Sequence, residues 1–579
     1  MKGKFAFIIL TIWLVVIAVL TAILISASID KNVDVDGAFA YSLNEDGASY
    51  SVGLADKDVY FGTELVIPSS FKGKPVTAIK ENGFSYCSGF SRLVIPASVT
   101  EIKYEAFKDC SSLSEVMFAD SMVLNKIGNA AFNNCDSLTA VKIPTGMKYL
   151  PYNLFHGCDK LRSVEIPKGI EEISDGAFGY CVALERVDIP YTVKQISDSA
   201  FYNCHALERI GFDGGEKPSN LRRIGRSAFY GCRSLGDVVF PEKIKEIGSG
   251  AFAYCESLRS VSFTGSALNE IGTSAFIGCD SLNRVDVADI ANWCGVNFVG
   301  NDYANPIYLG QRLYNNGELV LRLEIPYGVK TISARAFKNA TRIVSVTLPR
   351  DFDYESGSIG EDAFRFCYKL AEIHNFSKLQ LSSDTVSLAS TGYISAYVQH
   401  IYYWESTSYP KSGSPFPYGE SGAVYSEEES RKWETNIYTY GDNDEFIFYK
   451  SSSVHYLLEY LGTDKHIALP TTAKPYGIFT GAFFGQTGIE SIYVPDCVEE
   501  IWHFAFYSST DLKRIYIPSS VISMGDRLFG KTEDLQIYFE ASEHVVGWKE
   551  SYKDNATDVV INYSQNKEKL PWVMDLIED

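Results

Sequence analysis

Twelve cysteines raise the first chemical question, because thiols form disulfides, bind metals and act as nucleophiles. Ten of them follow a phenylalanine by three residues: Cys87, Cys110, Cys135, Cys158, Cys181, Cys204, Cys232, Cys255, Cys279 and Cys367. An oxidising compartment would permit disulfides, but a cysteine at one fixed position of a repeat, beside a phenylalanine, is typical of a small buried apolar residue. No C-x-x-C pair or clustered histidine indicates a metal site. We therefore interpret these residues as core packing, with Cys294 and Cys497 outside the column.

Other candidates for chemistry are weaker. The eight histidines fall in different units without ligand spacing. Asn32–Gly37 imitates the start of a calcium-binding loop, but Leu43 stands where the bidentate glutamate is required. The acidic stretch 442–445 is better explained as a solvated turn than as a Ca²⁺ site. Because the sequence also contains no H-E-x-x-H, G-x-S-x-G or Walker loop, we predict no enzymatic activity and no cofactor.

The elements that position these cysteines recur about every 23 residues. The phenylalanines lie at Phe84, Phe107, Phe132, Phe155, Phe178, Phe201, Phe229, Phe252 and Phe276, and the series resumes at Phe337, Phe364, Phe483, Phe506 and Phe529. A fixed period of this length is the sequence signature of a solenoid. We predict that Phe107, Phe132, Phe178, Phe201, Phe229 and Phe252 form its core together with Cys110, Cys135, Cys181 and Cys204.

Residues 184–206, LERVDIPYTVKQISDSAFYNCHA, show how one unit folds. Val187 and Ile189 alternate with polar residues, which is the period of a half-buried strand. Pro190 ends that strand because it cannot donate to a ladder. A second short extended piece carries Val193 and Ile196. Such a unit cannot bury its apolar face alone, so we predict stacked coils with a shared core.

The pattern L-x-x-V-x-I-P-x-x-V-x-x-I-x-x-x-A-F-x-x-C resembles the BspA-like, or Treponema pallidum-type, leucine-rich repeat. The resemblance covers roughly 60–375 and 465–535. It implies a leucine-rich-repeat solenoid of short parallel strands wound as a right-handed coil. It also implies a surface-exposed or secreted protein linked to adhesion.

The N-terminus carries a predicted membrane-targeting signal. Lys2 and Lys4 precede an apolar run from Phe5 to Ile25, which is long enough to span the roughly 30 Å hydrocarbon layer as a transmembrane helix. We favour an uncleaved signal-anchor over a cleaved signal peptide, with the lysines inside and the rest of the chain outside the cell membrane. The alternative is secretion after cleavage. The net charge of -20 argues against nucleic acid as a partner.

The remaining organisation follows from breaks in the period. We predict a signal-anchor or signal peptide (1–29), an N-terminal cap hairpin around Asp46-Gly47 (30–60), and repeats over 61–287, 319–377 and 445–540. Two aromatic-rich inserts interrupt them, at 288–318 and 378–444. Residues 541–579 form a C-terminal cap and tail, with Trp548 and Trp572 as packing residues.

Exposed aromatic clusters suggest recognition. Our ligand-binding candidates are Tyr402, Tyr403 and Trp404, then Trp293 and Tyr308, although the rings of the second insert would equally pack onto the solenoid. Along the outer sheet face, the outward row reads Lys142, Glu165, Asp188, Gly211, Val239, Ser262 and Asp286. We predict binding of an extracellular protein or glycan. The alternatives are a spacer module of a cell-envelope assembly and, less favoured, a hydrolase site within 378–440. The oligomeric state is left open.

Overall fold

The computed structural model describes residues 33–578 apart from 57–61, 121, 213–216, 311, 353–357, 380, 382–390, 397, 399, 404–436, 442–444, 451–454, 547, 554–555 and 557–558. The transmembrane helix predicted over 5–25 lies outside these residues. Among the helices that are described, none combines the length and apolar character that a bilayer crossing requires. The chain divides into two compact units, Met1–Asn283 with Phe298–Leu309, and Arg284–Asn297 with Gly310–Asp579.

The first unit begins with a cap. Strands β1 (Val33–Asp36), β2 (Phe39–Leu43) and β3 (Tyr50–Leu54) pair antiparallel, and β3 then pairs in parallel with β6 (Lys74–Ile79), which also pairs with β5 (Ser70–Phe71). The hairpin expected around Asp46-Gly47 is therefore present. It places Tyr41, Tyr50 and Val52 against the first coil, so the apolar end of the stack does not face water.

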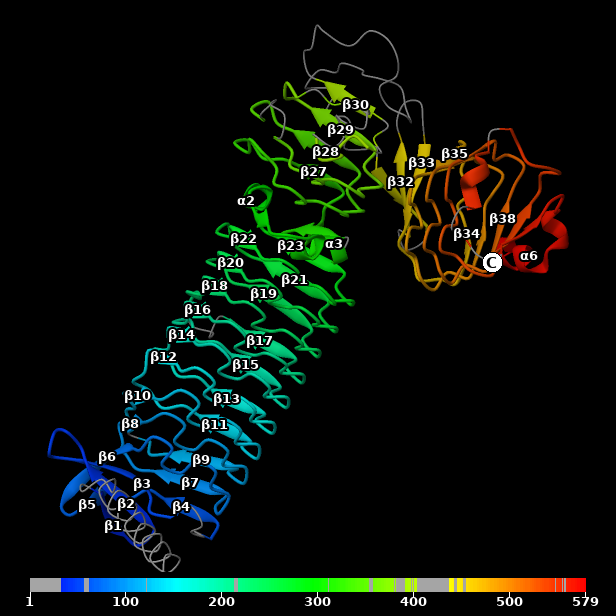
Figure 1. Cartoon of the computed structure of the whole chain (residues 1–579). Helices are drawn as coiled ribbons and strands as arrows, with labels where there is room; N and C mark the ends of the chain where they lie inside the picture. Colours follow the sequence, from blue (N-terminus) through cyan, green and yellow to red (C-terminus); the bar gives the residue numbers. More distant parts are fainter. Residues whose placement is uncertain are drawn as a thin grey trace, which may run out of the picture. The chain divides into compact units, whose positions relative to one another are not determined.

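Coils follow one another with two strands each (Figure 1). The outer sheet contains β4 (Glu64–Val66), β7 (Arg92–Ile95), β9 (Glu115–Phe118), β11 (Ala140–Lys142), β13 (Ser163–Glu165), β15 (Arg186–Asp188) and β17 (Arg209–Gly211). β19 (Asp237–Phe240) and β21 (Ser260–Phe263) pair with each other on the same side of the coils and are the first two strands of the next sheet. All these pairings are parallel, and Lys142 faces Glu165 as the outward row predicts.

The second side of each coil is a two-residue strand. These strands are β8 (Glu101–Ile102), β10 (Lys126–Ile127), β12 (Tyr149–Leu150), β14 (Glu172–Ile173), β16 (Gln195–Ile196), β18 (Arg223–Ile224), β20 (Glu246–Ile247) and β22 (Glu270–Ile271). The buried isoleucine or leucine of each strand points into the core. The last strand of this sheet is β24 (Asn297–Phe298). The short helix η1 (Asp302–Ala304) and helix α3 (Ile307–Gly310) follow it in the sequence.

The phenylalanines form a continuous stack inside the first unit. From Phe84 to Phe276, neighbouring ring centroids lie 5.1 to 5.7 Å apart with nearly parallel planes. The rings are buried, as are the cysteines beside them. Each ring is covered by the next coil, which explains why one 23-residue unit is not stable alone.

The second unit opens with β23 (Arg284–Val287), helix α2 (Ile290–Cys294), and the hairpin of β25 (Leu313–Asn315) and β26 (Glu318–Leu319). β25 pairs in parallel with β23. The segment 288–318 therefore breaks the sequence period as predicted but still contributes a strand to the sheet. Of its aromatic residues, Trp293 and Phe298 are buried, whereas Tyr303, Tyr308 and Tyr314 are half-buried.

β27 (Arg322–Glu324), β28 (Ser345–Leu348), β29 (Glu372–Asn375) and β30 (His400–Tyr403) form the next parallel sheet. The sequence predicts no repeat within 378–444. The structure differs there, because β30 lies inside this segment and pairs in parallel with β29. At its end, β31 (Ile437–Tyr440), β32 (Phe446–Lys450) and β33 (His455–Tyr460) form an antiparallel meander.

The last array starts from that meander, since β33 pairs in parallel with β35 (Tyr476–Ile478) as β3 pairs with β6. One sheet continues through β37 (Val498–Ile501) and β39 (Ser523–Met524). The other contains β34 (His466–Ala468), β36 (Ser491–Tyr493), β38 (Arg514–Ile517), β40 (Gln536–Phe539) and β41 (Val560–Asn562). The short helices η3 (Glu550–Lys553) and η4 (Lys567–Lys569) precede helix α6 (Pro571–Glu578).

The chain end covers the last coils of this array. Trp548 is buried and its indole N–H donates to the Val521 carbonyl at 3.0 Å. Trp572 is half-buried on α6 beside Tyr538. Val573 of α6 packs against Tyr493 and Tyr516. Both tryptophans therefore lie where packing residues of a cap were expected.

Candidate functional site

The cysteine column is built for packing. The Cys204 thiol is buried and donates to the carbonyl of Phe178 in the preceding coil, with Sγ 3.2 Å from the oxygen. The same bond recurs from Cys110 to Cys279, and Ser509 makes it to Phe483 in the last array. All twelve cysteines are free. Sequence reasoning did not foresee this bond, although the serine at the equivalent position was a signal for it.

Burial also suppresses thiol reactivity. It raises the pKa of Cys204 above its usual range and that of Cys367 to about 12. The thiolate is the reactive form of cysteine. A column of neutral, inaccessible thiols has no nucleophile to offer, and the part of the chain that the structure describes holds no group of three His, Cys, Asp or Glu residues placed to bind a metal ion.

The predicted ligand-binding residues do not come together. Trp293 is 1% exposed, and its indole N–H donates to the Ala336 carbonyl at 2.9 Å. It is a core residue, so its assignment to an exposed binding surface is corrected. Tyr308 is half-buried against Tyr303. Tyr402 and Tyr403 lie in β30, opposite His374 and Asn375 of β29. Trp404 and most of the segment in which a hydrolase site was considered lie outside the described residues.

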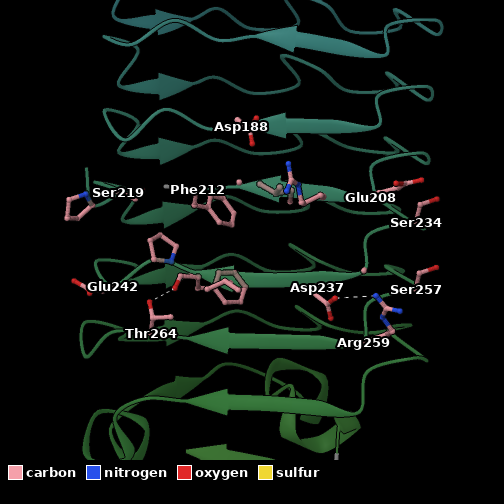
Figure 2. A pocket seen from close by; sticks show the side chains of 18 residues that line it. Asp188, Glu208, Phe212, Ser219, Ser234, Asp237, Glu242, Ser257, Arg259 and Thr264 are labelled. Atoms are coloured by element: carbon pink, nitrogen blue, oxygen red, sulfur yellow. Dashed lines mark hydrogen bonds and ion pairs between the residues drawn. The ribbon is translucent and has the colours of Figure 1, made fainter. Parts of the chain in front are cut away.

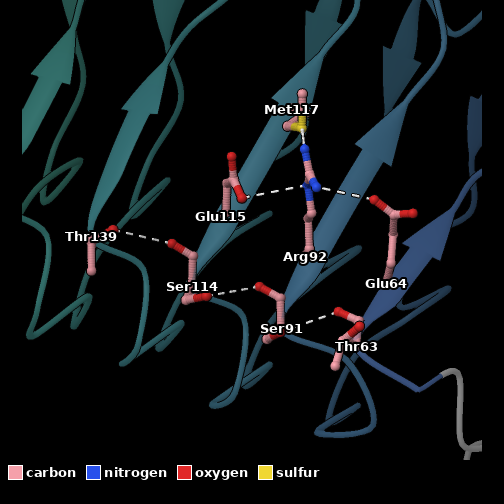
Figure 3. Close-up of polar contacts among 8 residues, drawn as sticks. All are labelled: Thr63, Glu64, Ser91, Arg92, Ser114, Glu115, Met117 and Thr139. Atoms are coloured by element: carbon pink, nitrogen blue, oxygen red, sulfur yellow. Dashed lines mark hydrogen bonds and ion pairs between the residues drawn. The ribbon is translucent and has the colours of Figure 1, made fainter.

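The outer sheet of the first unit offers a different surface. In its N-terminal part, charged side chains of adjacent strands form ion pairs with one another. Arg92 Nε lies 3.5 Å from Glu64 Oε1 and 3.4 Å from Glu115 Oε2 (Figure 3). Lys142 Nζ lies 3.2 Å from Glu165 Oε1. In Figure 3, hydroxyls before each strand donate to the carbonyl of the preceding coil, as Ser114 does to Ser91 at 3.0 Å. These groups satisfy one another across neighbouring strands.

Farther along the same unit, the outer face is hollowed. A hollow of about 1090 Å³ lies where β17 ends one sheet and β19 begins the next (Figure 2). Here the regular ladder is reduced, and the Gly236 amide donates to the Glu208 carbonyl at 3.2 Å. Glycines Gly211 and Gly236 line the hollow in positions where side chains would otherwise project. We call this site the hollow.

Only part of the charge around the hollow is neutralised by ion pairs. Arg259 Nη2 lies 3.3 Å from Asp237 Oδ2, and Ser260 donates to Asp237 at 2.7 Å. By contrast, Asp188, Glu208 and Glu242 make no ion pair with any described residue. Figure 2 shows Asp188 and Glu208 on the β17 side of the hollow and Asp237 with Arg259 on the other. The hollow therefore presents hydrogen-bonding groups that a partner could satisfy.

A strongly exposed valine stands among these charges. Val239 of β19 lines the hollow and is 57% exposed, at the outward position that Ser262 occupies in the next strand. The volume slightly exceeds the roughly 300–1,000 Å³ of small-molecule pockets, and its lining is richer in charged groups than theirs. An exposed apolar residue beside unpaired polar groups can form the centre of a protein interface.

Sequence reasoning named three of these residues but missed the site. Asp188, Gly211 and Val239 all stood in the predicted outward row, which was judged only for a charge stripe. Two signals were present, namely a side chain missing from that row at Gly211 and the longer spacing between Phe201 and Phe229. A Cβ at Gly211 would lie 2.5 Å from Asp188 Oδ1, so glycine leaves room there for the Asp188 carboxylate.

Comparisons with known proteins found several similar chains. Among solved structures, the chain is similar to a leucine-rich repeat protein from Bacteroides ovatus, with 21% identity, a TM-score of 0.38, and 64% of this chain and 99% of that chain covered. It is also similar to a leucine rich cell surface protein from Faecalibacterium prausnitzii (22%, TM-score 0.30, 62% and 97% covered) and to the pneumococcal vaccine antigen PcpA (16%, TM-score 0.35, 92% and 99% covered). No curated protein matches.

The family assignment rests on the repeat itself. Residues 77–208, 212–298, 304–391 and 465–558 match the model of the BspA type leucine rich repeat region. These ranges cover more than half of the chain and include the phenylalanine and cysteine positions of its coils. The chain therefore belongs to the BspA type leucine-rich repeat family.

Proposed function

We propose that this chain is an extracytoplasmic binding protein that holds a protein partner at the hollow, in an adhesion-type interaction at the cell surface. The observation that carries the proposal is the change along one sheet. From β4 to β13 ion pairs between adjacent strands neutralise neighbouring charges, whereas at the hollow three carboxylates lack an ion pair among the described residues and Val239 is exposed. Association with a complementary surface would cover that valine and pair those groups.

The chemistry of the hollow indicates what the partner should offer. Asp188, Glu208 and Glu242 would attract lysine or arginine side chains, while Asp237 is already held by Arg259. Such charge complementarity favours the rate and specificity of association. A partner with an apolar residue flanked by basic side chains fits both Val239 and the carboxylates.

The test places a photo-crosslinking amino acid at position 239 of the full chain, in the cells that produce it. Position 66 is the matched control, because Val66 is 51% exposed in β4 and lies in the same outward row. We expect one protein to crosslink from 239 and not from 66. The affinity for that protein should then fall at least tenfold in Val239→Lys and stay unchanged in Val66→Lys. Equal crosslinking from both positions would contradict the proposal.

Localisation is part of the proposal. The apolar run from Phe5 to Ile25 supports a chain anchored in the cell membrane with its C-terminal region outside, or one secreted after cleavage. Membrane fractionation together with N-terminal sequencing of the mature chain separates the two. A chain that remains in the cytoplasm would contradict both.

A spacer role in a cell-envelope assembly is the second candidate. The self-contained polar ladders of β4 to β13 favour it, because that surface has few unpaired groups for a ligand (Figure 3). A spacer needs the length of the chain and not the hollow. Under this alternative, Val239→Lys leaves every interaction of the chain intact.

A further inference from the structure

A ladder of five rings runs along the first unit, in the turns that carry the core phenylalanines. His156, Tyr180, Tyr202, Tyr230 and Tyr254 come from five successive coils. Neighbouring centroids lie 5.2, 5.4, 4.8 and 5.2 Å apart. Tyr180 and Tyr254 are 42% and 43% exposed. We call these five residues the aromatic ladder.

Each coil of the ladder supplies one ring and one small residue. The ring stands either one or two residues after the core phenylalanine, and the other position holds Gly157, Gly179, Asn203, Gly231 or Ala253. At the end of the ladder, Tyr254 lies against Gly278, where a Cβ would come within 2.6 Å of Tyr254 Cδ1.

Two of the tyrosines occupy an unfavourable backbone conformation. Tyr180 and Tyr254 have φ of 60° and 58°, at the position where neighbouring coils place Asn203, Gly231 and Gly278. Asparagine and glycine tolerate this left-handed region, whereas a bulky aromatic residue there is an outlier. The turn requires this conformation in other coils as well, for example at Asp109 and Asn134, so tyrosine is kept here where smaller residues fit better. Packing does not require these rings, because they are exposed while the core phenylalanines are not.

The tilt of the rings shapes the surface. Tyr202 and Tyr230 are nearly parallel, with planes 7° apart. The planes of Tyr180 and Tyr254 are turned from these two by 48° and 61°. The ladder thus has two stacked central rings bordered by two tilted and more exposed ones. The tilted rings offer part of their faces and their hydroxyls to solvent.

The aromatic ladder carries no charge at neutral pH. Four of its members are phenols, and burial lowers the pKa of His156 below its usual value near 6.5. The small residues between the rings are glycine, alanine and asparagine. An anionic or cationic polymer finds no matching charge among these groups, whereas rings and hydroxyls suit a ligand with hydroxyls and apolar C–H faces.

The distance between successive rings narrows the choice of ligand class further. An extended polypeptide presents side chains on one face about every 6.6 Å, because successive residues rise about 3.3 Å and alternate sides. The ladder steps by 4.8 to 5.4 Å. That mismatch disfavours a regular peptide strand. A neutral linear polysaccharide carries no charge, and one of its sugar units is close to one coil step in length.

We propose that the aromatic ladder binds an uncharged linear polysaccharide, laid along the solenoid with its sugar units in step with the coils. This site is separate from the hollow, since its residues lie in the turns after each phenylalanine and not in the outer sheet. It goes beyond the protein partner proposed above, and each site can be lost without the other.

The experiment uses affinity gel electrophoresis and calorimetry of the full chain with hydroxyethylcellulose, xylan, galactomannan, pullulan and laminarin. Heparin and poly-L-proline serve as the anionic and polypeptide comparators. The test variant is Tyr180→Asn/Tyr254→Asn, because Asn203 shows that asparagine fits this left-handed position. The matched control is Tyr86→Asn, which changes an exposed tyrosine with φ of 60° outside the ladder.

We expect at least one neutral polysaccharide to bind, with an affinity that is insensitive to salt. It should fall at least tenfold in the double variant and stay unchanged in Tyr86→Asn, with the circular dichroism spectrum preserved in both. The proposal is overturned if no neutral polysaccharide binds, if binding survives in the double variant, or if only heparin or poly-L-proline binds. None of these outcomes affects crosslinking from position 239.

Discussion

Cysteine 204 allows a sharp prediction about why the column is cysteine. Its thiol is buried and donates to the Phe178 carbonyl, which also accepts the Cys181 amide at 3.2 Å. Cys204→Ala removes the weaker of these two donors and a methylene-sized group. The lost burial is worth about 0.8 kcal/mol, and a net hydrogen bond about 0.5–1 kcal/mol. With the unfilled volume, we expect a loss of about 2 kcal/mol.

Cys204→Ser discriminates between a hydrogen-bonding and a purely apolar column. In an apolar site, a buried hydroxyl without a partner costs about 1–3 kcal/mol, so serine would be worse than alanine. Here the Phe178 carbonyl is in place, and Ser509 already donates to the Phe483 carbonyl at 2.7 Å. We therefore expect Cys204→Ser to be no less stable than Cys204→Ala.

The assay is native-state hydrogen exchange of the full chain, followed at the amides of residues 184–232. Local opening is the right measure because a stack of coils need not unfold in a single step. Cys497→Ala is the control, since this half-buried residue lies in the second unit outside the column. A Cys204→Ser variant that is more than about 1 kcal/mol less stable than Cys204→Ala would refute the donor role of the thiol.

Three further predictions test the second unit and the thiols. Trp293→Ala should lower the stability of the second unit by about 3–5 kcal/mol, because it removes a 1% exposed indole from the core. Urea unfolding monitored at coils of that unit measures the loss. An unchanged unfolding midpoint would contradict the assignment of Trp293 to the core. Burial opposes ionisation of Asp362, yet the hydrogen bond and charge of Lys338, 2.7 Å away, hold its pKa below the usual 3.8. The stability that ionised Asp362 gives the folded chain is therefore present above pH 3.8 and is lost as the pH falls through the lower folded-state pKa. Asp362→Asn should reduce the dependence of the second unit's melting temperature on acid pH in a series of thermal melts. An identical slope of melting temperature against pH in both proteins would contradict this prediction. In the native chain, Cys497 should react with a maleimide before the ten column cysteines, because those are buried and the pKa values of several are raised. Mass mapping after short labelling identifies the cysteines that react first. Early labelling of Cys204 would contradict its role in core packing.

The coil, its strands and its core could be predicted from sequence because they depend on local patterns. Val187 and Ile189 alternate, Pro190 ends the strand, and Phe201 recurs in step, so one unit already contains the rule for its neighbours. The N-terminal hairpin was found for the same reason, since Asp46-Gly47 is a local turn signal.

The surfaces could not be predicted as well because they depend on contacts between coils. Aromatic density around Trp293 did not reveal that its ring is buried beneath Ala336. The hollow arises where two sheets meet, and only Gly211 and the longer spacing between Phe201 and Phe229 hinted at it. The aromatic ladder escaped notice because its rings alternate between two sequence positions, as in Tyr180 and Tyr202, and align only once the coils are stacked.

The most direct test of the account is a hydrogen-exchange footprint of the full chain with the partner identified by crosslinking from position 239. If the hollow is the binding site, exchange should slow in β17, in β19 and at Ser219, while β9 and β11, whose outward charges are already paired, exchange at unchanged rates. Protection confined to β9 and β11, or no protection near the hollow at saturating partner, would contradict the assignment of function to this break in the sheet.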